Sequence, residues 1–253
     1  MPKCQDFSLT LHRKCAVKDT LGGINDRKIL SDTRLQRPLD LLPEPTLRRL
    51  PWYLAYVTTL NAEGVEYVSS TRISGDLHVD ASQIAKDLSF LNIKGKTRIG
   101  YEVASLETTL RSFLGFDTRH SAVMVGVGSL GAALMQDSGL GRYGLNIVAG
   151  IDVNPAIIDT RIAGIPVYGP GRLTGLVREL GITIGILAVP VESAQSVADE
   201  LVAAGVHALW NFTPTRIRVA DGVVVTNTSI YSHLAVMYNR LATVSDTQHH
   251  REQ

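Results

Sequence analysis

A glycine-rich turn between an apolar strand and a helix constrains the fold of this chain more than any other stretch. An apolar run over residues 122–125 leads directly into Gly126-Val-Gly-Ser-Leu-Gly131, and a helical pattern rich in alanine and leucine follows. A second apolar run, over residues 145–151, ends at Asp152. Short apolar strands that alternate with helices are typical of a parallel sheet with helices on both faces. The stretch therefore predicts an α/β domain, which we place at residues 116–227.

The glycines of this turn have distinct expected roles. Gly126 allows the tight turn, Gly128 lets the backbone approach a pyrophosphate, and Gly131 lets the helix pack closely on the strand. Free N–H groups at the helix N-terminus favour phosphate. Asp152 stands 21 residues after Gly131, where an acid can bind the hydroxyls of a ribose. The sequence predicts a Rossmann-type dinucleotide site; the alternative is a glycine-rich turn of an ordinary α/β domain with Asp152 as a loop cap.

The composition is ordinary for a globular protein. The chain has 253 residues, of which 45% are hydrophobic and 19% charged, and its net charge is +1. No apolar run reaches the ~20 residues of a membrane helix, and the N-terminus lacks the apolar core of a signal peptide. Cys4 and Cys15 form neither a metal-ligand set nor a disulfide framework. We expect a cytoplasmic protein that uses no membrane and no metal.

The pattern of residues 44–115 predicts a separate helical domain ahead of the sheet. Apolar residues at helical spacing predict a first helix over residues 46–61, capped by Thr46, and a short second helix follows. Asp80 and Gln83 form a capping box at the start of a third helix. The apolar face of that third helix leaves four side chains partly outward: Gln83, Lys86, Asp87 and Phe90.

A basic hairpin is expected after the third helix. Gly95 can make a tight turn between two short strands, with lysine and arginine at the tip. Three helices followed by such a hairpin are a winged-helix pattern, in which the third helix enters the DNA major groove and the wing touches the backbone or the minor groove. The alternative is a small helical domain with a solvated charged loop.

The remaining segments complete the predicted domain plan. Residues 1–43 are polar without sustained periodicity, and we expect a flexible arm there. A last amphipathic helix is expected over residues 228–243, followed by a disordered tail over residues 244–253.

The sheet domain offers few groups for catalysis. A hydride-transfer enzyme usually needs a proton donor beside the nicotinamide, such as His, Lys or a Tyr–Lys pair. Residues 116–253 contain no lysine, and we expect His207 to be structural and His233 to lie at a subunit interface. The sequence therefore favours a sensor over an enzyme and offers no catalytic residue.

This combination resembles the Rex family of redox-sensing transcriptional repressors. The resemblance covers residues 44–241 and rests on segments that follow in the same order. They are Thr46-Leu-Arg-Arg-Leu-Pro-Trp-Tyr-Leu54, Gln83-Ile-Ala-Lys-Asp-Leu-Ser-Phe90, Gly95-Lys96 with Ile99-Gly-Tyr101, the glycine loop, Ile151-Asp-Val-Asn-Pro155, Val189-Pro190 with Ala194-Gln195, and Ala204-Gly205 through Trp210-Asn-Phe212-Thr-Pro214. The family implies a homodimer that binds a palindromic operator at a low NADH/NAD⁺ ratio, releases it when NADH binds, and exchanges its C-terminal helices between subunits near the nicotinamide pocket.

The resemblance also implies roles for individual residues. The set implied at NAD (NADH or NAD⁺) is Gly126, Val127, Gly128, Ser129, Leu130, Gly131, Asp152, Val153, Val189, Pro190, Tyr101, Asn211, Ser229 and Ile230. The set implied at operator DNA is Arg49, Ser82, Gln83 and Lys86, with Lys94, Lys96 and Arg98 on the wing.

The sequence departs from the family pattern at both expected sites. Ala85 replaces an arginine of the recognition helix, and a bidentate arginine–guanine contact is worth about 1–3 kcal/mol of discrimination. Ala55 and Ser229 stand where the family has an Arg and an Asp that exchange with the Tyr, and Ile230 replaces the aromatic residue that helps close the nicotinamide pocket. We hypothesise a divergent member or paralogue that keeps dinucleotide binding but has an altered DNA target and an altered response to reduction.

Two other functions remain open at this point. The first is a Rex-like dinucleotide sensor that has lost specific DNA binding and acts through a protein partner, which Ala85 and the modest basic patch suggest. The second is a small oxidoreductase or a CoA-binding protein, because CoA also presents a pyrophosphate to such a loop.

Overall fold

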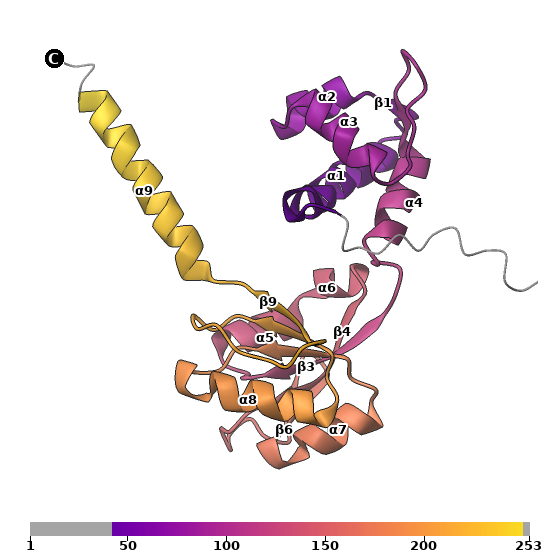
Figure 1. The fold of residues 1–253 in the computed structure, drawn as a ribbon. Coiled ribbons are helices and arrows are strands. Elements are labelled where there is room, and N and C mark those ends of the chain that lie inside the picture. The colour runs from indigo at the N-terminus through magenta and orange to yellow at the C-terminus, as the bar shows by residue number, and fades with distance from the viewer. Residues whose placement is uncertain (1–41, 250–253) are drawn as a thin grey trace, which may run out of the picture. The chain divides into compact units, whose positions relative to one another are not determined.

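The computed structural model describes residues 42–249, so the arm predicted for residues 1–43 lies almost wholly outside the described residues. The described chain comprises a helical segment, a seven-stranded sheet with its helices, and a C-terminal helix (Figure 1). None of its helices is both long enough and apolar enough to span a bilayer.

The helical segment combines helices with a small two-stranded sheet. An aliphatic core joins its helices and buries Leu54, Ile73, Ile84 and Leu106. Its elements are α1 (Glu44–Ala62), β1 (Tyr67–Val68), α2 (Ser70–Leu77), α3 (Ala81–Ser89), β2 (Tyr101–Glu102) and α4 (Val103–Phe113). This is the predicted order of three helices, a turn of chain at the wing, and a linking helix.

Three local predictions in this segment were wrong. Thr46 does not cap α1, which begins at Glu44; its hydroxyl donates to the Asp87 carboxylate instead. Asp80 does cap α3, but the Gln83 side chain does not return to the cap, because the Asp87 carboxylate one turn later is a charged acceptor within reach. Asp87 itself was expected to point partly outward and is fully buried.

The predicted wing hairpin is also paired differently. Lys96 and Gly100 form a single bridge, whereas β2 pairs antiparallel with β1, which comes from before α2. Gly100 makes this pairing possible: its φ is +109°, and an added Cβ would lie 2.4 Å from the carbonyl oxygen of Val68.

The second segment is the predicted parallel sheet. Its order is β5-β6-β4-β3-β7-β8-β9, and only β5 runs antiparallel to its neighbour. The strands are β3 (His120–Val125), β4 (Leu145–Ile151), β5 (Arg161–Ile162), β6 (Ile165–Tyr168), β7 (Ile184–Leu187), β8 (Ala208–Asn211) and β9 (Val224–Asn227). The helices are α5 (Ser129–Gln136), α6 (Ser138–Arg142), the 3-10 turn η2 (Pro170–Arg172), α7 (Leu173–Glu179) and α8 (Val191–Ala204).

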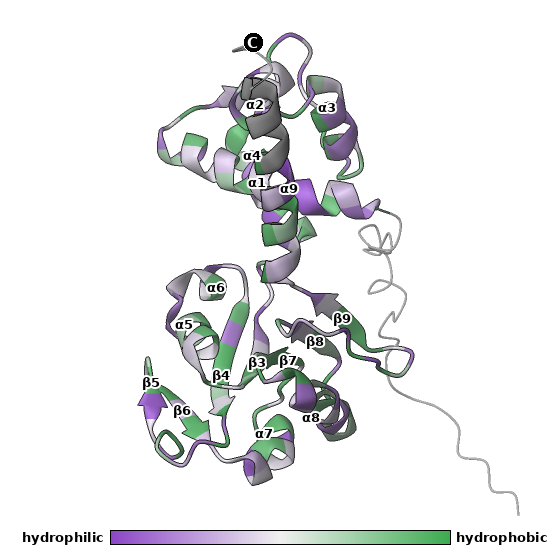
Figure 2. Cartoon of the chain, turned by 90° about the vertical axis from the view of Figure 1, so that its left-hand side faces the viewer, coloured by the Kyte–Doolittle hydropathy of each residue, from purple (hydrophilic) through white to green (hydrophobic). Residues whose placement is uncertain are grey.

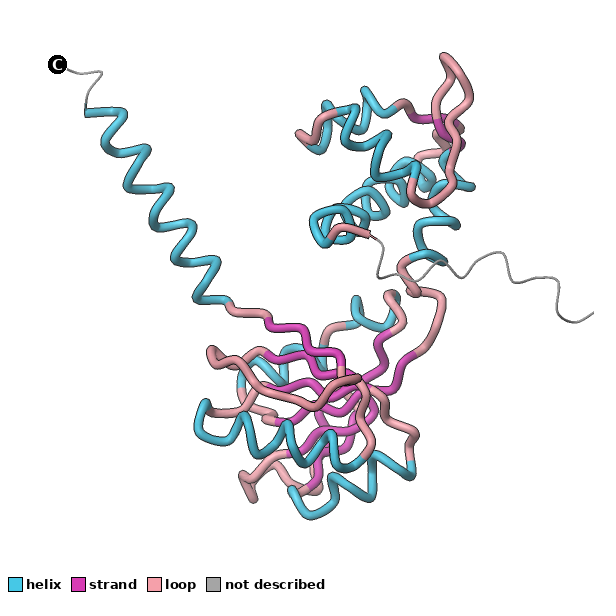
Figure 3. The backbone as a smooth tube through the Cα atoms, in the orientation of Figure 1, coloured by secondary structure: helices cyan, strands magenta, loops and turns pink. Residues whose placement is uncertain are grey.

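Apolar side chains cover both faces of this sheet, as a doubly wound fold requires. One core joins β3, β4 and β7 to α7 and α8, and includes Val123, Leu187 and Leu201. The other joins the opposite face to α5 and includes Met124 and Met135. The central strands are largely green on the hydropathy scale of Figure 2, and the strands lie between helices in Figure 3. The glycine loop between β3 and α5 therefore emerges at the carboxyl edge of a packed sheet.

The C-terminal helix α9 (Ile230–His249) is longer than predicted. It continues past residue 243 because no glycine or proline interrupts the sequence before His249. The predicted disordered tail over residues 244–253 is thus helical in its first part. Several large apolar side chains of α9 are exposed: Ile230, Tyr231, Val236, Met237 and Tyr238.

Candidate functional site

Two glycines of the loop are required by packing within the protein. Gly126 has a φ of +89°, and a Cβ added there would lie 2.4 Å from the carbonyl oxygen of Ala188. A Cβ added to Gly131 would lie 2.0 Å from the carbonyl oxygen of Gly126. Real Cβ atoms do not approach backbone atoms so closely, so both positions exclude a side chain whether or not a ligand is bound.

Gly128 has no such explanation within the protein. It precedes α5 with an extended backbone, and no atom lies within 4 Å of an added Cβ. It lines a cavity of ≈ 660 Å³, and the N-terminal amides of α5 follow it directly. A glycine that leaves open space at a helix N-terminus fits the close approach of a phosphate group. The residues present therefore fit a dinucleotide.

Asp152 lines the same cavity at the end of β4. One of its carboxylate oxygens accepts the N–H of Val127 at 2.6 Å, and the other accepts the N–H of Asn154 at 2.8 Å. These bonds fix the carboxylate at the mouth of the glycine loop. Each oxygen has two lone pairs, so the carboxylate can still accept from the hydroxyls of a ribose.

The cavity brings together six of the residues predicted for the cofactor: Gly126, Gly128, Asp152, Val153, Val189 and Pro190. Sequence reasoning missed its other walls, above all one face of α8. That face supplies Ser193, Ser196, Val197 and Glu200, and the start of α7 supplies Leu173. The proline that precedes α8 was visible in the sequence, but which side of the helix would face the loop was not.

A second hollow, of ≈ 260 Å³, adjoins the first through Ala188 and Val189, which line both. Its other walls come from α5, from the segment after β8, and from the start of α9. They are Leu130, Phe212, Thr213, Pro214, Ile230 and Tyr231. The predicted residues Leu130 and Ile230 are therefore brought together in this second hollow, whereas Asp152 lines the first.

Three predicted residues support the walls rather than line them. Asn211 is fully buried: its amide nitrogen donates to the Thr215 carbonyl, and its amide oxygen accepts from Thr213. Val127 is buried against the sheet, and its N–H holds Asp152. Ser229 caps α9, because its hydroxyl oxygen accepts the N–H of Ser232.

Two further predicted cofactor residues lie outside both hollows. Ser129 is exposed on the first turn of α5. Tyr101 lies in β2 and packs against the core of the helical segment, where burial raises the pKa of its hydroxyl. Their roles at the cofactor stay predictions.

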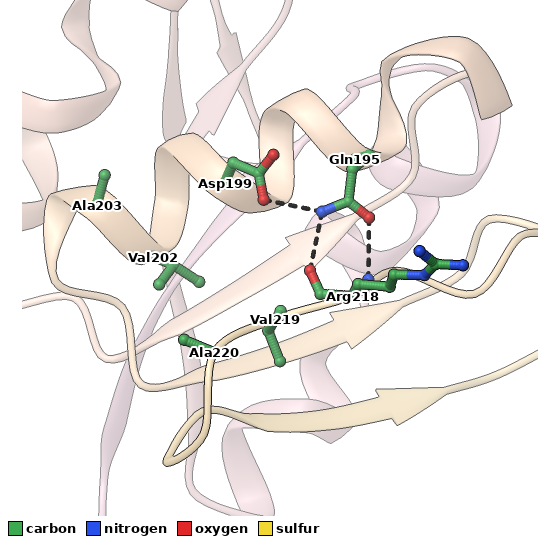
Figure 4. A pocket seen from close by; sticks show the side chains of 7 residues that line it. All are labelled: Gln195, Asp199, Val202, Ala203, Arg218, Val219 and Ala220. Carbon is green, nitrogen blue, oxygen red and sulfur yellow. Dashed lines mark hydrogen bonds between the residues drawn. The ribbon is translucent and has the colours of Figure 1, made fainter.

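Gln195 ties α8 to the segment that follows β8. Its amide nitrogen donates to the Arg218 carbonyl at 2.8 Å and its amide oxygen accepts the Arg218 N–H at 2.9 Å, as Figure 4 shows. The nitrogen also donates to Asp199 one turn along the helix. One side chain thus pairs with the backbone as a neighbouring strand would, and this fixes the segment that begins at Phe212.

The face of α3 predicted to contact DNA is largely polar. Asp80 caps this helix through the N–H groups of Ser82 and Gln83. Figure 1 shows α3 beside α2, the arrangement of a helix-turn-helix. The residues exposed along α3 are Ser82, Ala85, Lys86 and Ser89, and Gln83 is half-buried at the margin.

A buried carboxylate fixes this helix to α1. Asp87 is fully buried and accepts five hydrogen bonds, which we call the Asp87 cluster. They come from Thr46 Oγ1 at 3.0 Å, Arg49 Nε at 2.7 Å, Arg49 Nη2 at 2.8 Å, Tyr53 OH at 2.8 Å and Gln83 Nε2 at 2.8 Å.

The cluster changes the titration of its members. Burial alone would raise the pKa of Asp87, but the hydrogen bonds, first that from Arg49, hold it below its ordinary value. The hydrogen bond to Asp87 raises the pKa of Arg49, and burial raises the pKa of Tyr53. The charged pair of Asp87 and Arg49 with a neutral Tyr53 is therefore the stable form at neutral pH.

The predicted DNA-contacting residues fall into two groups. Arg49 and Gln83 already donate to Asp87, and Lys96 donates from Nζ to Tyr67 OH at 2.6 Å. Lys96 is nevertheless exposed, as are Ser82, Lys86, Lys94 and Arg98, and the Ser82 hydroxyl donates to Asp80. Their roles at DNA stay predictions.

Comparison with known proteins gives the family. Residues 42–89 match the model of a putative DNA-binding protein N-terminus, and residues 117–215 match a CoA binding domain. The chain is 60% identical over 200 residues to a redox-sensing transcriptional repressor Rex of Porphyromonas gingivalis, covering 79% of this chain and 92% of the relative. It is 56% identical over 200 residues to the Rex repressor of Bacteroides fragilis, covering 79% and 91%.

The chain belongs to the Rex family. Solved structures agree at lower identity. A crystal structure of RSP, a Rex-family repressor, in complex with β-NAD⁺ and operator DNA has a TM-score of 0.78 at 30% identity, covering 84% of this chain and 98% of that chain. The β-NADH complex of RSP has a TM-score of 0.74 at 32% identity, covering 82% and 98%. The predicted winged helix followed by a Rossmann-type sheet is confirmed.

Proposed function

We propose that this chain is a redox-sensing transcriptional repressor that binds operator DNA as a homodimer and is modulated by NADH and NAD⁺. One observation carries the proposal: a cavity built on Gly126, Gly128 and Asp152 occurs in the same Rex-family chain as a capped, exposed recognition helix. A dinucleotide site in the same chain as a DNA-binding segment supports a sensor, because the ligand can then change the affinity for DNA. We place the protein in the cytoplasm, where it would meet both DNA and the dinucleotide pool.

In this proposal the protein groups bind and orient the cofactor. The backbone around Gly128 and the N-terminal amides of α5 hold the pyrophosphate, and Asp152 accepts from a ribose. Val189, Leu130 and Ile230 line the end of the site where the nicotinamide would lie. When bound, NADH and NAD⁺ differ in charge and shape at that ring, which gives the protein a difference to sense.

The exposed apolar residues of α9 support the homodimer. A helix that exposes Tyr231, Val236 and Tyr238 in a single chain needs a partner surface to bury them. In the family arrangement, each subunit's last helix is exchanged with the other near the nicotinamide end. Ile230 and Tyr231, at the start of α9, line the second hollow. This supports placing the start of α9 at the nicotinamide end of the site.

The test is a binding titration on an operator selected from random DNA with the full-length chain. We expect NADH to weaken DNA binding by about 5- to 150-fold, the range of a 1–3 kcal/mol coupling, with a smaller effect of NAD⁺. DNA binding that is specific but unchanged by saturating NADH would refute the regulation and leave the DNA-binding assignment intact.

One observation favours a second function, a dinucleotide sensor without specific DNA binding. Ala85 lies at the centre of the exposed face of α3, so the position that would carry an arginine offers no base contact. Selection from random DNA that enriches no sequence, with NADH binding retained, would favour this function.

A further inference from the structure

The orientation of one amide on α3 follows from the chemistry of the Asp87 cluster. Gln83 lies at the margin between the buried and the exposed faces of α3, and its Nε2 donates to Asp87 Oδ1 at 2.8 Å. A carboxylate only accepts hydrogen bonds when ionised. The amide therefore cannot turn over without directing its own oxygen at a buried negative charge, and its nitrogen must face Asp87.

Both oxygens of the Asp87 carboxylate are held in place by other donors. The same Oδ1 also accepts from Thr46 and from Arg49, and Oδ2 accepts from Arg49 and Tyr53. A carboxylate has about four lone-pair sites, so five donors saturate it. The guanidinium of Arg49 holds it ionised, with 20% of the Arg49 side chain and none of the Asp87 side chain exposed.

The free groups of Gln83 are then fixed in kind. One N–H of Nε2 is used by Asp87, which leaves the other N–H and the oxygen Oε1. Within the described residues, no hydrogen bond to Gln83 Oε1 occurs. Gln83 thus keeps one acceptor and one N–H. These two groups lie side by side in the amide plane when Asp87 takes the N–H that points away from Oε1, and this is the orientation that the proposal requires.

We propose that Asp87 orients Gln83 as an adenine reader on the recognition helix. In the major groove, adenine presents a donor at N6 beside an acceptor at N7, which complements the free oxygen and N–H of Gln83. Guanine presents two acceptors, O6 and N7, and would place O6 against Gln83 Oε1. Asp87 is a positioning residue, because it acts through Gln83 and touches no base. This inference rests on the proposed function, since it concerns how the operator is read.

Few side chains of α3 other than Gln83 are long enough to reach a base. Among its exposed residues only Lys86 has a long side chain, because Ala85 replaces the arginine that the family pattern carries. Base reading by long side chains of α3 then falls to Lys86 and Gln83. The second of these is the one whose donor and acceptor are fixed by a neighbour.

The experiment is selection from random DNA without dinucleotide, followed by titration of single-base variants of the selected operator. We expect wild type to prefer adenine at one position of each half-site by about 5- to 150-fold over guanine, the range of 1–3 kcal/mol. Gln83→Ala should abolish the preference at that position and preserve it elsewhere. Asp87→Asn should lose it too, although Gln83 is still present, because an amide at residue 87 can donate to Oε1 and turn Gln83 over.

Thr46→Val is the matched control, since it removes another donor to Oδ1 without touching the bond to Gln83. It should leave the base preference unchanged. Should Asp87→Asn fail to fold, the wild-type amide can be observed directly by ¹⁵N NMR, with Gln83→Ala to assign it. We expect one of its two protons to be protected from exchange by Asp87, and two equally exposed protons would overturn the positioning role.

The outcomes separate the two proposals. An operator that is selected by wild type and read identically by Gln83→Ala refutes this inference alone. Selection that enriches no sequence with wild type refutes the DNA-binding half of the proposed function, and this inference with it.

Discussion

The Asp87 cluster and the glycine loop are both polar sites that involve helices, but they are constructed in opposite ways. In the Asp87 cluster, every lone pair of a buried carboxylate is matched by a donor from α1 or α3. In the glycine loop, a Cβ added at Gly128 would meet no protein atom within 4 Å, and the N-terminal amides of α5 are left available. The first site is complete without a ligand, whereas the second is complete only with one.

Because of this difference, mutations at the two sites should reduce different quantities, folding stability at one and ligand affinity at the other. Removing one member of a saturated buried cluster strands the others away from water, so the cost falls on folding. Changing a position that faces open space costs little in the free protein, so the cost falls on the ligand. The Asp87 cluster should therefore respond to mutation in stability, and the outer part of the glycine loop in affinity.

The largest expected effect is that of Asp87→Ala. It leaves the partly buried Arg49 and the buried Tyr53 and Thr46 without their shared acceptor, and breaking a buried ion pair costs about 3–5 kcal/mol. Urea unfolding of the full chain should detect the loss, and DNA binding should fall with it, while NADH binding is retained. Glu44→Ala is the matched control: it breaks an ion pair with Arg48 whose side chains are 74% and 73% exposed, and should cost no more than ~1 kcal/mol. Equal losses for the two variants would contradict the contrast.

Two glycine substitutions should split the loop into a folding part and a binding part. Gly131→Ala places a methyl 2.0 Å from a backbone oxygen, so α5 must shift, at a cost of about 1–3 kcal/mol. Gly128→Ala meets no protein atom and should change the free energy of unfolding by no more than ~0.5 kcal/mol. Calorimetry should nevertheless find at least ~10-fold weaker NADH binding for both. A Gly128→Ala variant with wild-type affinity would remove the pyrophosphate from this position.

These two sites were not equally readable from the sequence. Gly126, Gly128, Gly131 and Asp152 were predicted with their roles. A tight turn, the approach of a phosphate to the backbone and the packing of a helix on a strand each require glycine, and together they place the glycines at a fixed spacing. The protein-side part of that prediction is confirmed by the contacts of Gly126 and Gly131. The walls from α8 were missed, because spacing along a chain does not say which side of a distant helix faces the loop.

The Asp87 cluster could not be predicted at all. Arg49 and Tyr53 lie on α1 whereas Asp87 lies on α3, and nothing in one sequence pairs the two helices. A charged residue on an amphipathic helix is exposed far more often than buried, so Asp87 was predicted to face partly outward. Only the crossing of α1 and α3 brings a guanidinium to it and makes burial of the charge favourable.

The titration of the cluster gives a pH dependence confined to one region. Hydrogen bonds hold the pKa of Asp87 below the unfolded value near 3.9, so its contribution to stability is present above that pH and is lost as the pH falls through the folded pKa. Burial raises the pKa of Tyr53, so its contribution is present below the unfolded pKa of about 10 and is lost as the pH rises through the folded one. The protection factors of the α3 amides, which compare the exchange rate with the intrinsic rate at the same pH, should therefore be highest between these limits. In Asp87→Asn, the protection of the α3 amides should no longer fall at low pH. If it still falls as in wild type, other carboxylates cause the effect.

Asp152 tests the contrast most finely, because it belongs to both kinds of site. It lines the ligand cavity, yet each of its oxygens already accepts a backbone N–H, from Val127 and from Asn154. Asp152→Asn turns one of these oxygens into a donor that faces an N–H, so we expect a loss of about 1–3 kcal/mol in stability from the unpaired group. The lost charge should weaken NADH binding by about 10-fold and NADPH binding by less, because a carboxylate repels a 2′-phosphate. Parallel fluorescence titrations with both dinucleotides measure the ratio. A variant that loses affinity for both equally would mean that Asp152 acts only by holding the loop, as Asp87 holds its helices.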